Sequence, residues 1–159
     1  LNMYVLAEAP NGKLSVANDS LKRNLKTWLN QYRMINDTID ILDGKILNFR
    51  IDFDVVGHRD YNKHDVLNQC VKVLRDEFAQ PKYMGEPFYI SDIQNMLNDV
   101  DGVTDVKMVK VTCMNGGIYS DSFLDIAQQK SADGRYIVIP ENCAVEIKYP
   151  RNDIVGTIT

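Results

Sequence analysis

The chain has 159 residues, of which 45% are hydrophobic and 25% charged, a composition typical of a globular domain and not of a disordered chain. Its formal net charge of −4 provides no excess of positive charge for a phosphate backbone, so nucleic acid is not an expected partner. No apolar run approaches the roughly 20 residues that cross a bilayer, and no signal peptide is visible, so a membrane is not an expected partner either.

The cysteines and the start of the chain carry two further expectations. Cys70, Cys113 and Cys143 have no CxxC spacing, and an odd number of widely spaced cysteines indicates free buried thiols in a reducing compartment. The chain begins at Leu1, directly before an expected strand over residues 2–7, so we expect the sequence to be a fragment of a larger protein.

A helix is predicted after a loop over residues 8–18. Asn18, Asp19 and Ser20 offer side chains that can cap its first N–H groups. One apolar stripe follows at helical spacing and consists of Leu21, Leu25, Trp28, Leu29 and Tyr32. Such a stripe predicts packing in the core or against another helix, and an exposed aromatic patch is the alternative.

The clearest strand signal covers residues 46–56. Apolar side chains at odd positions alternate with polar ones, which predicts one packed face and one face that is wet or meets a partner, as in an antiparallel sheet. Asp43-Gly44 is a two-residue turn signal, so we expect a hairpin between residues 38–42 and this strand.

Two more helices and a strand are predicted in the middle of the chain. The first helix begins after Asn62 and ends before Pro81. The second is expected to start at Ser91 with a capping box and to end at Gly102, placed as the left-handed C′ glycine. Residues 103–113 follow as a strand with apolar side chains on both sides, which favours an interior position in the sheet.

These elements predict an α+β fold, with an antiparallel sheet, helices packed on one face and a ferredoxin-like β-α-(β)-α-β core. We divide the chain into a lead-in of strand, helix and hairpin over residues 1–44, the ferredoxin-like domain over 45–113, and a C-terminal strand extension over 114–159. The extension is expected to pack on the core or to swap from it, and its last residues are either frayed or paired with another subunit.

No catalytic, cofactor or metal constellation emerges from the sequence. Asp52 and Asp54 lie on one strand face beside Arg50, where a polar surface is the simplest interpretation and a contact with a neighbouring subunit is favoured over catalysis. His58 and His64 lack a recognised zinc-ligand spacing and are expected to be solvated loop residues. We therefore predict no enzyme activity and no small-molecule substrate.

One run resembles a known family. Gly85-Glu86-Pro87-Phe88-Tyr89-Ile90-Ser91-Asp92-Ile93, followed by Val100-Asp101-Gly102-Val103-Thr104-Asp105-Val106, is similar to the C-terminal part of the baseplate J-like family of contractile phage tails. The likeness extends to the large baseplate wedge subunits of T-even-type myoviruses, through residues 25–37, 146–150 and 153–156, and is weakest from 117 to 135.

This resemblance implies a structural role in the virion. Wedge subunits of this kind dimerise, link into a ring around the tail hub and hold neighbouring wedge proteins, with no cofactor or catalytic residue implied. The motif residues Gly85, Glu86, Ser91, Asp92, Ile93, Gly102, Val103, Asp105 and Val106 are then structural. Candidate contact residues are Trp28, Tyr32, Arg50, Asp52, Asp54, Tyr149 and Ile154. The alternatives are an assembly module of a non-phage contractile injection system, or a small α+β binding domain.

Overall fold

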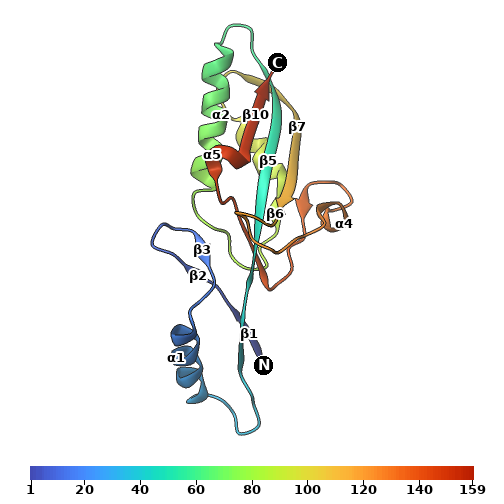
Figure 1. The fold of residues 1–159 in the computed structure, drawn as a ribbon. Coiled ribbons are helices and arrows are strands. Elements are labelled where there is room, and N and C mark those ends of the chain that lie inside the picture. Colours follow the sequence, from blue (N-terminus) through green and yellow to red (C-terminus); the bar gives the residue numbers. More distant parts are fainter.

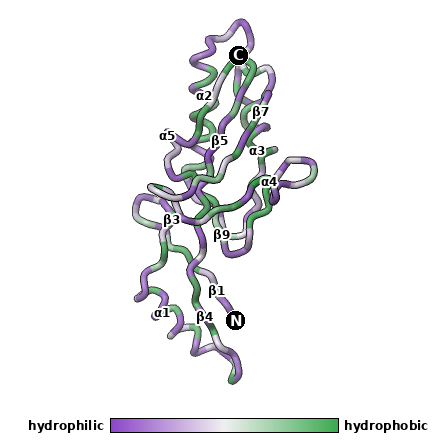
Figure 2. The backbone as a smooth tube through the Cα atoms, turned by 45° about the vertical axis from the view of Figure 1, so that its right-hand side comes forward, coloured by the Kyte–Doolittle hydropathy of each residue, from purple (hydrophilic) through white to green (hydrophobic).

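The computed structural model describes all 159 residues as an α+β protein in which a narrow arm extends from a larger body (Figure 1). The arm consists of residues 1–44 and the body of residues 45–159. Figure 2, turned by 45°, shows α1, β1 and β4 of the arm standing clear of the body, whereas β3 lies beside it. No helix is both long and apolar enough to span a membrane.

Strand β5 (Lys45–Gly57) is the axis of the body and confirms the strand predicted over residues 46–56. Its alternation decides which face is packed, because successive side chains of a strand point to opposite sides. Five side chains on one face are almost completely inaccessible to solvent: Leu47, Phe49, Ile51, Phe53 and Val55. They form the centre of the single large hydrophobic core of the chain.

The sheet around β5 is mixed, so the prediction of an antiparallel sheet is wrong. β7 (Val103–Met114) runs antiparallel to β5 on one side. On the other side two strands run parallel to β5. β9 (Cys143–Glu146) pairs with residues 45–48 of β5, and β10 (Ile154–Ile158) pairs with residues 51–55. The expected frayed or swapped tail is therefore β10, a strand of the chain's own sheet.

β7 lies at an edge of the sheet and not in its interior, because its one strand partner is β5. Two register shifts explain why the sequence suggested burial on both sides. They leave Thr104 and Lys107 without a partner on β5, and each extra residue reverses the alternation. Val103, Val106 and Val109 consequently all pack against the core.

Helices α2 (Lys63–Glu77) and α3 (Ile90–Asn98) cover the same face of the sheet, as predicted, with Cys70, Leu74, Ile93 and Leu97 buried in the common core. α2 begins at the predicted cap, since the side chain of Asn62 accepts a hydrogen bond from the His64 amide.

The capping box predicted at Ser91 does not form. α3 starts one residue earlier, with Tyr89 at the N-cap position and no capping side chain. The backbone carbonyl of Arg135 instead accepts from the amides of Ile90 (2.8 Å) and Ser91 (3.0 Å). This carbonyl is the hydrogen-bond acceptor for free N–H groups at the start of the helix. A segment distant in the sequence therefore does the work of a capping side chain.

Gly102 has a left-handed φ of +90°, as predicted, but it lies beyond the C-cap residue Asp99 and so is not the C′ glycine of α3. A Cβ atom at this position would lie 2.7 Å from Val66 and 2.9 Å from the ring of Tyr61. The turn that leads into β7 therefore needs glycine both for its backbone angle and for its space.

The arm pairs β1 (Asn2–Val5) with β4 (Asp40–Asp43) in parallel, so the hairpin predicted at Asp43-Gly44 is wrong. β4 leads almost directly into β5 through Gly44, where a Cβ atom would meet Leu6 and the sulfur of Met84, each at 2.8 Å. Helix α1 (Asp19–Asn30) begins at the predicted Asn18 cap, and β2 (Ala7–Glu8) and β3 (Leu14–Ser15) form a small hairpin.

The remaining elements are short. β6 (Phe88–Tyr89) pairs with β8 (Tyr136–Ile137) outside the main sheet. Two helical turns, α4 (Ile126–Gln129) and α5 (Pro150–Asp153), lie in the connections that carry the chain from β7 across to β9 and from β9 to β10. β9 and β10 thus act as one edge strand that α5 interrupts.

Candidate interaction surfaces

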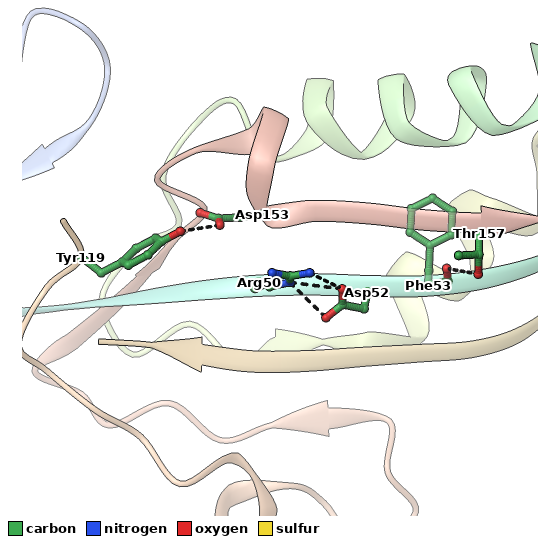
Figure 3. A network of polar contacts seen from close by, with 6 residues as sticks. All are labelled: Arg50, Asp52, Phe53, Tyr119, Asp153 and Thr157. Atoms are coloured by element: carbon green, nitrogen blue, oxygen red, sulfur yellow. Dashed lines mark hydrogen bonds and ion pairs between the residues drawn. The ribbon is translucent and has the colours of Figure 1, made fainter. Parts of the chain in front are cut away.

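The face of the sheet opposite the helices carries the charged residues predicted to meet a partner. Arg50 and Asp52 lie on this face of β5, and the guanidinium Nη2 of Arg50 lies 3.1 Å from the Asp52 carboxylate (Figure 3). The hydrogen bond and charge of Asp52 raise the pKa of Arg50. Both side chains are about one-third exposed, so the pair is wet and adds little to stability.

Asp54 continues the charged row along β5. Its carboxylate accepts a hydrogen bond of 3.1 Å from the hydroxyl of Thr157 on β10. The same hydroxyl lies 3.4 Å from the backbone carbonyl of Phe53 (Figure 3). On the other side of β5, Lys110 and Met108 of β7 lie opposite Asp52 and Asp54 and are exposed. The face therefore mixes both signs of charge with apolar side chains, a composition found at protein–protein contacts.

The two candidates from the tail lie elsewhere. Ile154 pairs with Ile51 and is 3% exposed, so it belongs to the core and not to a free surface. The ring of Tyr149 is half-buried and lies 5.8 Å from the ring of Tyr119. Neither residue offers the outer surface that the sequence interpretation required.

A buried carboxylate lies where the edge strand is interrupted. Asp153, at the end of α5, is 1% exposed and accepts a hydrogen bond of 2.7 Å from the hydroxyl of Tyr119 (Figure 3). This hydrogen bond is the main reason why the pKa of Tyr119 is raised to about 12. Asp153 also accepts from the Tyr149 amide at 3.3 Å, which closes the α5 turn.

Two further buried polar residues, Asn48 and Glu146, lie opposite each other on β5 and β9, where the arm meets the body. The side-chain oxygen Oδ1 of Asn48 accepts a hydrogen bond from the Ser120 amide at 2.7 Å. The carboxylate of Glu146 accepts one from the Leu14 amide of the β2–β3 hairpin at 3.0 Å. Both residues border a surface cavity of about 530 Å³. Glu146 thus fastens the arm to the body.

Sequence interpretation missed Asp153, Tyr119, Asn48 and Glu146. The alternation of residues 46–56 placed Asn48 on the polar face of its strand, which is correct, but that pattern does not indicate which loop covers the face. The covering partners Ser120 and Leu14 lie 72 and 132 positions away in the sequence. No local signal in the chain could have identified these contacts.

The α1 stripe does not pack in the core of the chain, and its alternative, an exposed aromatic patch, describes the chain by itself. None of the residues of α1 is buried. Leu21, Trp28 and Tyr32 are 50%, 55% and 71% exposed, and the Trp28 and Tyr32 rings lie 5.0 Å apart. The stripe lacks a partner because the arm presents only the short β1–β4 pair to the helix.

The first part of the run that carries the family resemblance shapes turns and fills the core. Gly85 has φ of +73°, and a Cβ atom there would lie 3.3 Å from the backbone of Glu141. Glu86 closes a turn by accepting from the Tyr83 amide at 3.0 Å. Ile93 is completely buried, whereas Asp92, in the first turn of α3, is exposed.

The second part of the run does the same at the start of β7. Val103 and Val106 pack on the core, and the Asp105 carboxylate accepts from the Val106 amide at 2.8 Å. With Gly102 they shape the turn and the first bulge of the strand. The motif residues of the run thus make packing and backbone contacts.

The histidines and the cysteines form no reactive cluster. His58 is exposed in the β5–α2 connection, whereas His64, predicted in a loop, is exposed in the first turn of α2. No group of three or more histidine, cysteine or acidic side chains could hold a metal ion. The three cysteines are buried and unpaired, as predicted, and burial raises the pKa of each thiol.

No protein-family model matches the chain, and no curated protein matches it significantly.

Proposed function

We propose that this chain is the C-terminal part of a structural wedge subunit of a contractile-tail baseplate, located in the virion and assembled in the host cytoplasm. One observation carries the proposal: the arm leaves much of the apolar side of helix α1 exposed. Leu21, Trp28 and Tyr32 are each at least half exposed. Exposed apolar patches of this kind mark sites of contact with other proteins.

The family-like run supports the same role. Gly85 and Gly102 occupy left-handed turns against neighbouring backbone and side chains, and Ile93 fills the core. A motif of this kind makes a rigid block, which an assembly needs, and it brings no reacting groups together. We extend the proposal to the fold: β5-α2-β6-α3-β7 follows a ferredoxin-like β-α-β-β-α-β order with one short strand, β6, in place of the middle two, and β6 pairs outside the main sheet.

Two surfaces are available for ring contacts in this proposal. The first is the exposed side of α1. The second is the open sheet face with Arg50, Asp52 and Asp54, whose mixed charges suit a polar partner surface. The partners would be further copies of the chain and other baseplate wedge proteins. No nucleic acid, membrane, cofactor or small-molecule substrate takes part, and the chain has no catalytic role of its own.

Two alternatives share the same physical basis. A wedge of a non-phage contractile injection system would use the same surfaces and differ only in the particle that contains it. A small α+β binding domain would use α1 or the sheet face for a single partner. An enzyme would need Asp52, Asp54 and His58 to converge in a cavity, whereas Asp52 pairs with Arg50, Asp54 bonds Thr157 and His58 is exposed.

The test is whether the chain is a component of contractile particles. Tail particles would be purified from the phage or bacterium that encodes it, and their proteins identified by mass spectrometry. We expect peptides of this chain in amounts comparable to known wedge proteins. Its absence from intact contractile particles, together with its presence in the unassembled protein fraction, would refute the proposal and leave the binding-domain alternative.

A further inference from the structure

The apolar stripe of α1 has the spacing of a coiled-coil seam. Leu21, Leu25 and Trp28 of α1, and Tyr32 in the turn directly after it, follow at intervals of four, three and four residues, which are d, a, d and a positions of a heptad repeat. Leu29, at the adjacent e position, widens the stripe on one side and is half-buried. The exposed part of the stripe is thus the a/d seam, which suits one other helix.

The arm already occupies one flank of this seam and leaves the other free. Lys22 reaches Asp43, where β4 ends, at 3.0 Å, and Leu29 on the same flank is half-buried. Leu25 of the seam is also half-buried, whereas Leu21, Trp28 and Tyr32 are at least half exposed. The opposite flank carries Asn24 and Gln31, which are both exposed. In Figure 1 α1 lies at the end of the arm away from α2 and the sheet of the body, so the free flank is open to another molecule.

The charges of α1 permit an identical helix as the partner. Arg23 and Lys26 lie at f and b positions, away from the seam, and Lys22 is paired with Asp43 and Asp19. Two copies would therefore meet without opposing their positive charges. Across an antiparallel pair the flanks would bring Asn24 beside Gln31 of the second copy, and two amides can hydrogen-bond each other.

The apolar area is sufficient for a stable contact between two copies. Five side chains of α1 and the turn after it are between 50% and 100% exposed: Leu21, Trp28, Tyr32, Met34 and Ile35. At roughly 150–250 Å² for a large side chain, they present on the order of 600 Å² per copy. Two copies would bury about 1,200 Å², the lower limit of a specific interface.

We infer that α1 pairs in an antiparallel manner with α1 of a second copy of this chain. Leu21 then packs against Tyr32 of the second copy, and Leu25 against its Trp28, so each layer sets a large side chain against a smaller one. A parallel pair would oppose Trp28 to Trp28 and would align the helix dipoles unfavourably. The inference deepens the proposed function and rests on it for the expectation that copies of the chain meet.

The first test measures the oligomeric state of the purified chain by light scattering and reads Trp28 fluorescence, since Trp28 is the only tryptophan. We expect dimers, and a shift of the Trp28 emission to shorter wavelength as the concentration rises. Trp28→Arg should give monomers with an unchanged thermal midpoint of the body. The matched control is Tyr83→Arg, which replaces an aromatic side chain that is 85% exposed on the body and should leave the dimer intact.

The second test determines the direction of the helices with engineered disulfides. A mixture of Leu21→Cys and Tyr32→Cys chains should form a covalent heterodimer on mild oxidation. Neither variant alone should cross-link. In an antiparallel pair the two copies of Leu21, or of Tyr32, are offset by eleven positions, about 16 Å at the helical rise per residue. The native cysteines are buried and would not compete. Cross-linking of Leu21→Cys with itself would show a parallel pair and refute the antiparallel arrangement.

The outcomes separate this inference from the proposed function. A monomer at every concentration, or a dimer that Trp28→Arg leaves intact, would overturn the α1 contact. A monomer whose Trp28 is covered only when a different protein is added would replace the second copy with that partner. None of these results removes the chain from a contractile particle, and the particle composition tests the proposed function independently.

Discussion

The hydroxyl of Tyr119 donates a hydrogen bond of 2.7 Å to Asp153, a carboxylate that is only 1% exposed. This contact joins the loop after β7 to the helical turn between β9 and β10, so it connects the two edges of the sheet across β5. A buried carboxylate is tolerable only where donors surround it, and here the Tyr149 amide is the second donor.

Removing the Tyr119 hydroxyl should therefore destabilise the body. We expect Tyr119→Phe to lower the free energy of unfolding by about 1–3 kcal/mol, because Asp153 stays buried with one donor fewer. Denaturant unfolding followed by circular dichroism measures the change. Tyr83→Phe is the matched control, since Tyr83 is 85% exposed and its loss of a hydroxyl should change nothing measurable. Equal stability of the two variants would contradict the importance of the bond.

The same contact predicts a loss of stability at alkaline pH. The pKa of Tyr119 is raised from its ordinary value of 10.0 to about 12 in the folded chain. Since the fold favours the protonated phenol, the stabilisation is complete below pH 10 and is lost as the pH rises towards about 12. The unfolding free energy of the native chain should fall in this window more steeply than that of Tyr119→Phe. Parallel curves would show that Tyr119 titrates normally.

Gly102 tests whether the family-like run acts by packing. Gly102→Ala should cost at least about 2 kcal/mol, because the added methyl group meets Val66 and Tyr61 below 3 Å and the backbone has φ of +90°. Gly116→Ala is the control with a left-handed φ of +76° and nothing within 4 Å of the new atom. Its free energy of unfolding should fall by only about 1 kcal/mol, because the substitution strains the left-handed backbone and meets no neighbouring atom. Similar thermal shifts in both variants would exclude a steric role for Gly102.

Glu146 should control how firmly the arm is held. Its carboxylate accepts from the Leu14 amide, and the ammonium of Lys13 donates to the Ile147 carbonyl beside it at 3.2 Å. We expect Glu146→Ala to release the β2–β3 hairpin, with faster hydrogen exchange at Leu14 and faster proteolysis in residues 7–15. Glu146→Gln keeps an acceptor and should preserve most of the protection. Unchanged exchange in Glu146→Ala would mean that other contacts hold the arm.

The sequence predicts the elements whose causes are local. The alternation of residues 46–56 correctly places Phe49 and Phe53 in the core, and the Asn18 and Asn62 caps begin α1 and α2 as expected. Alternation and capping depend on a few neighbouring residues, so they can be recognised without knowing the rest of the fold.

The errors arise where distant segments decide the outcome. Asp43-Gly44 has the sequence of a hairpin turn, yet β4 pairs with β1, and Leu6 and Met84 pack on Gly44, so the chain runs on. Ser91 is a suitable cap, but the Arg135 carbonyl accepts from the amides of Ile90 and Ser91, so the helix begins before Ser91.

The candidate site shows the same division. Arg50, Asp52 and Asp54 lie on an open face as alternation predicts, whereas the exposure of Trp28 depends on how little of the arm surrounds α1. Apolar residues at helical spacing predict that one side of the helix packs against another surface. They do not predict whether that surface belongs to the same chain.

The central claim is that the chain builds a baseplate, and its position in an assembled particle tests this most directly. Electron cryo-microscopy of contractile tails purified from the phage or bacterium that encodes the chain would locate the sheet of the body and the arm. We expect density for the chain in a ring around the tail hub, with neighbouring subunits on the α1 side of the arm. A baseplate whose density is fully explained by other proteins, with no place for this chain, would contradict the claim.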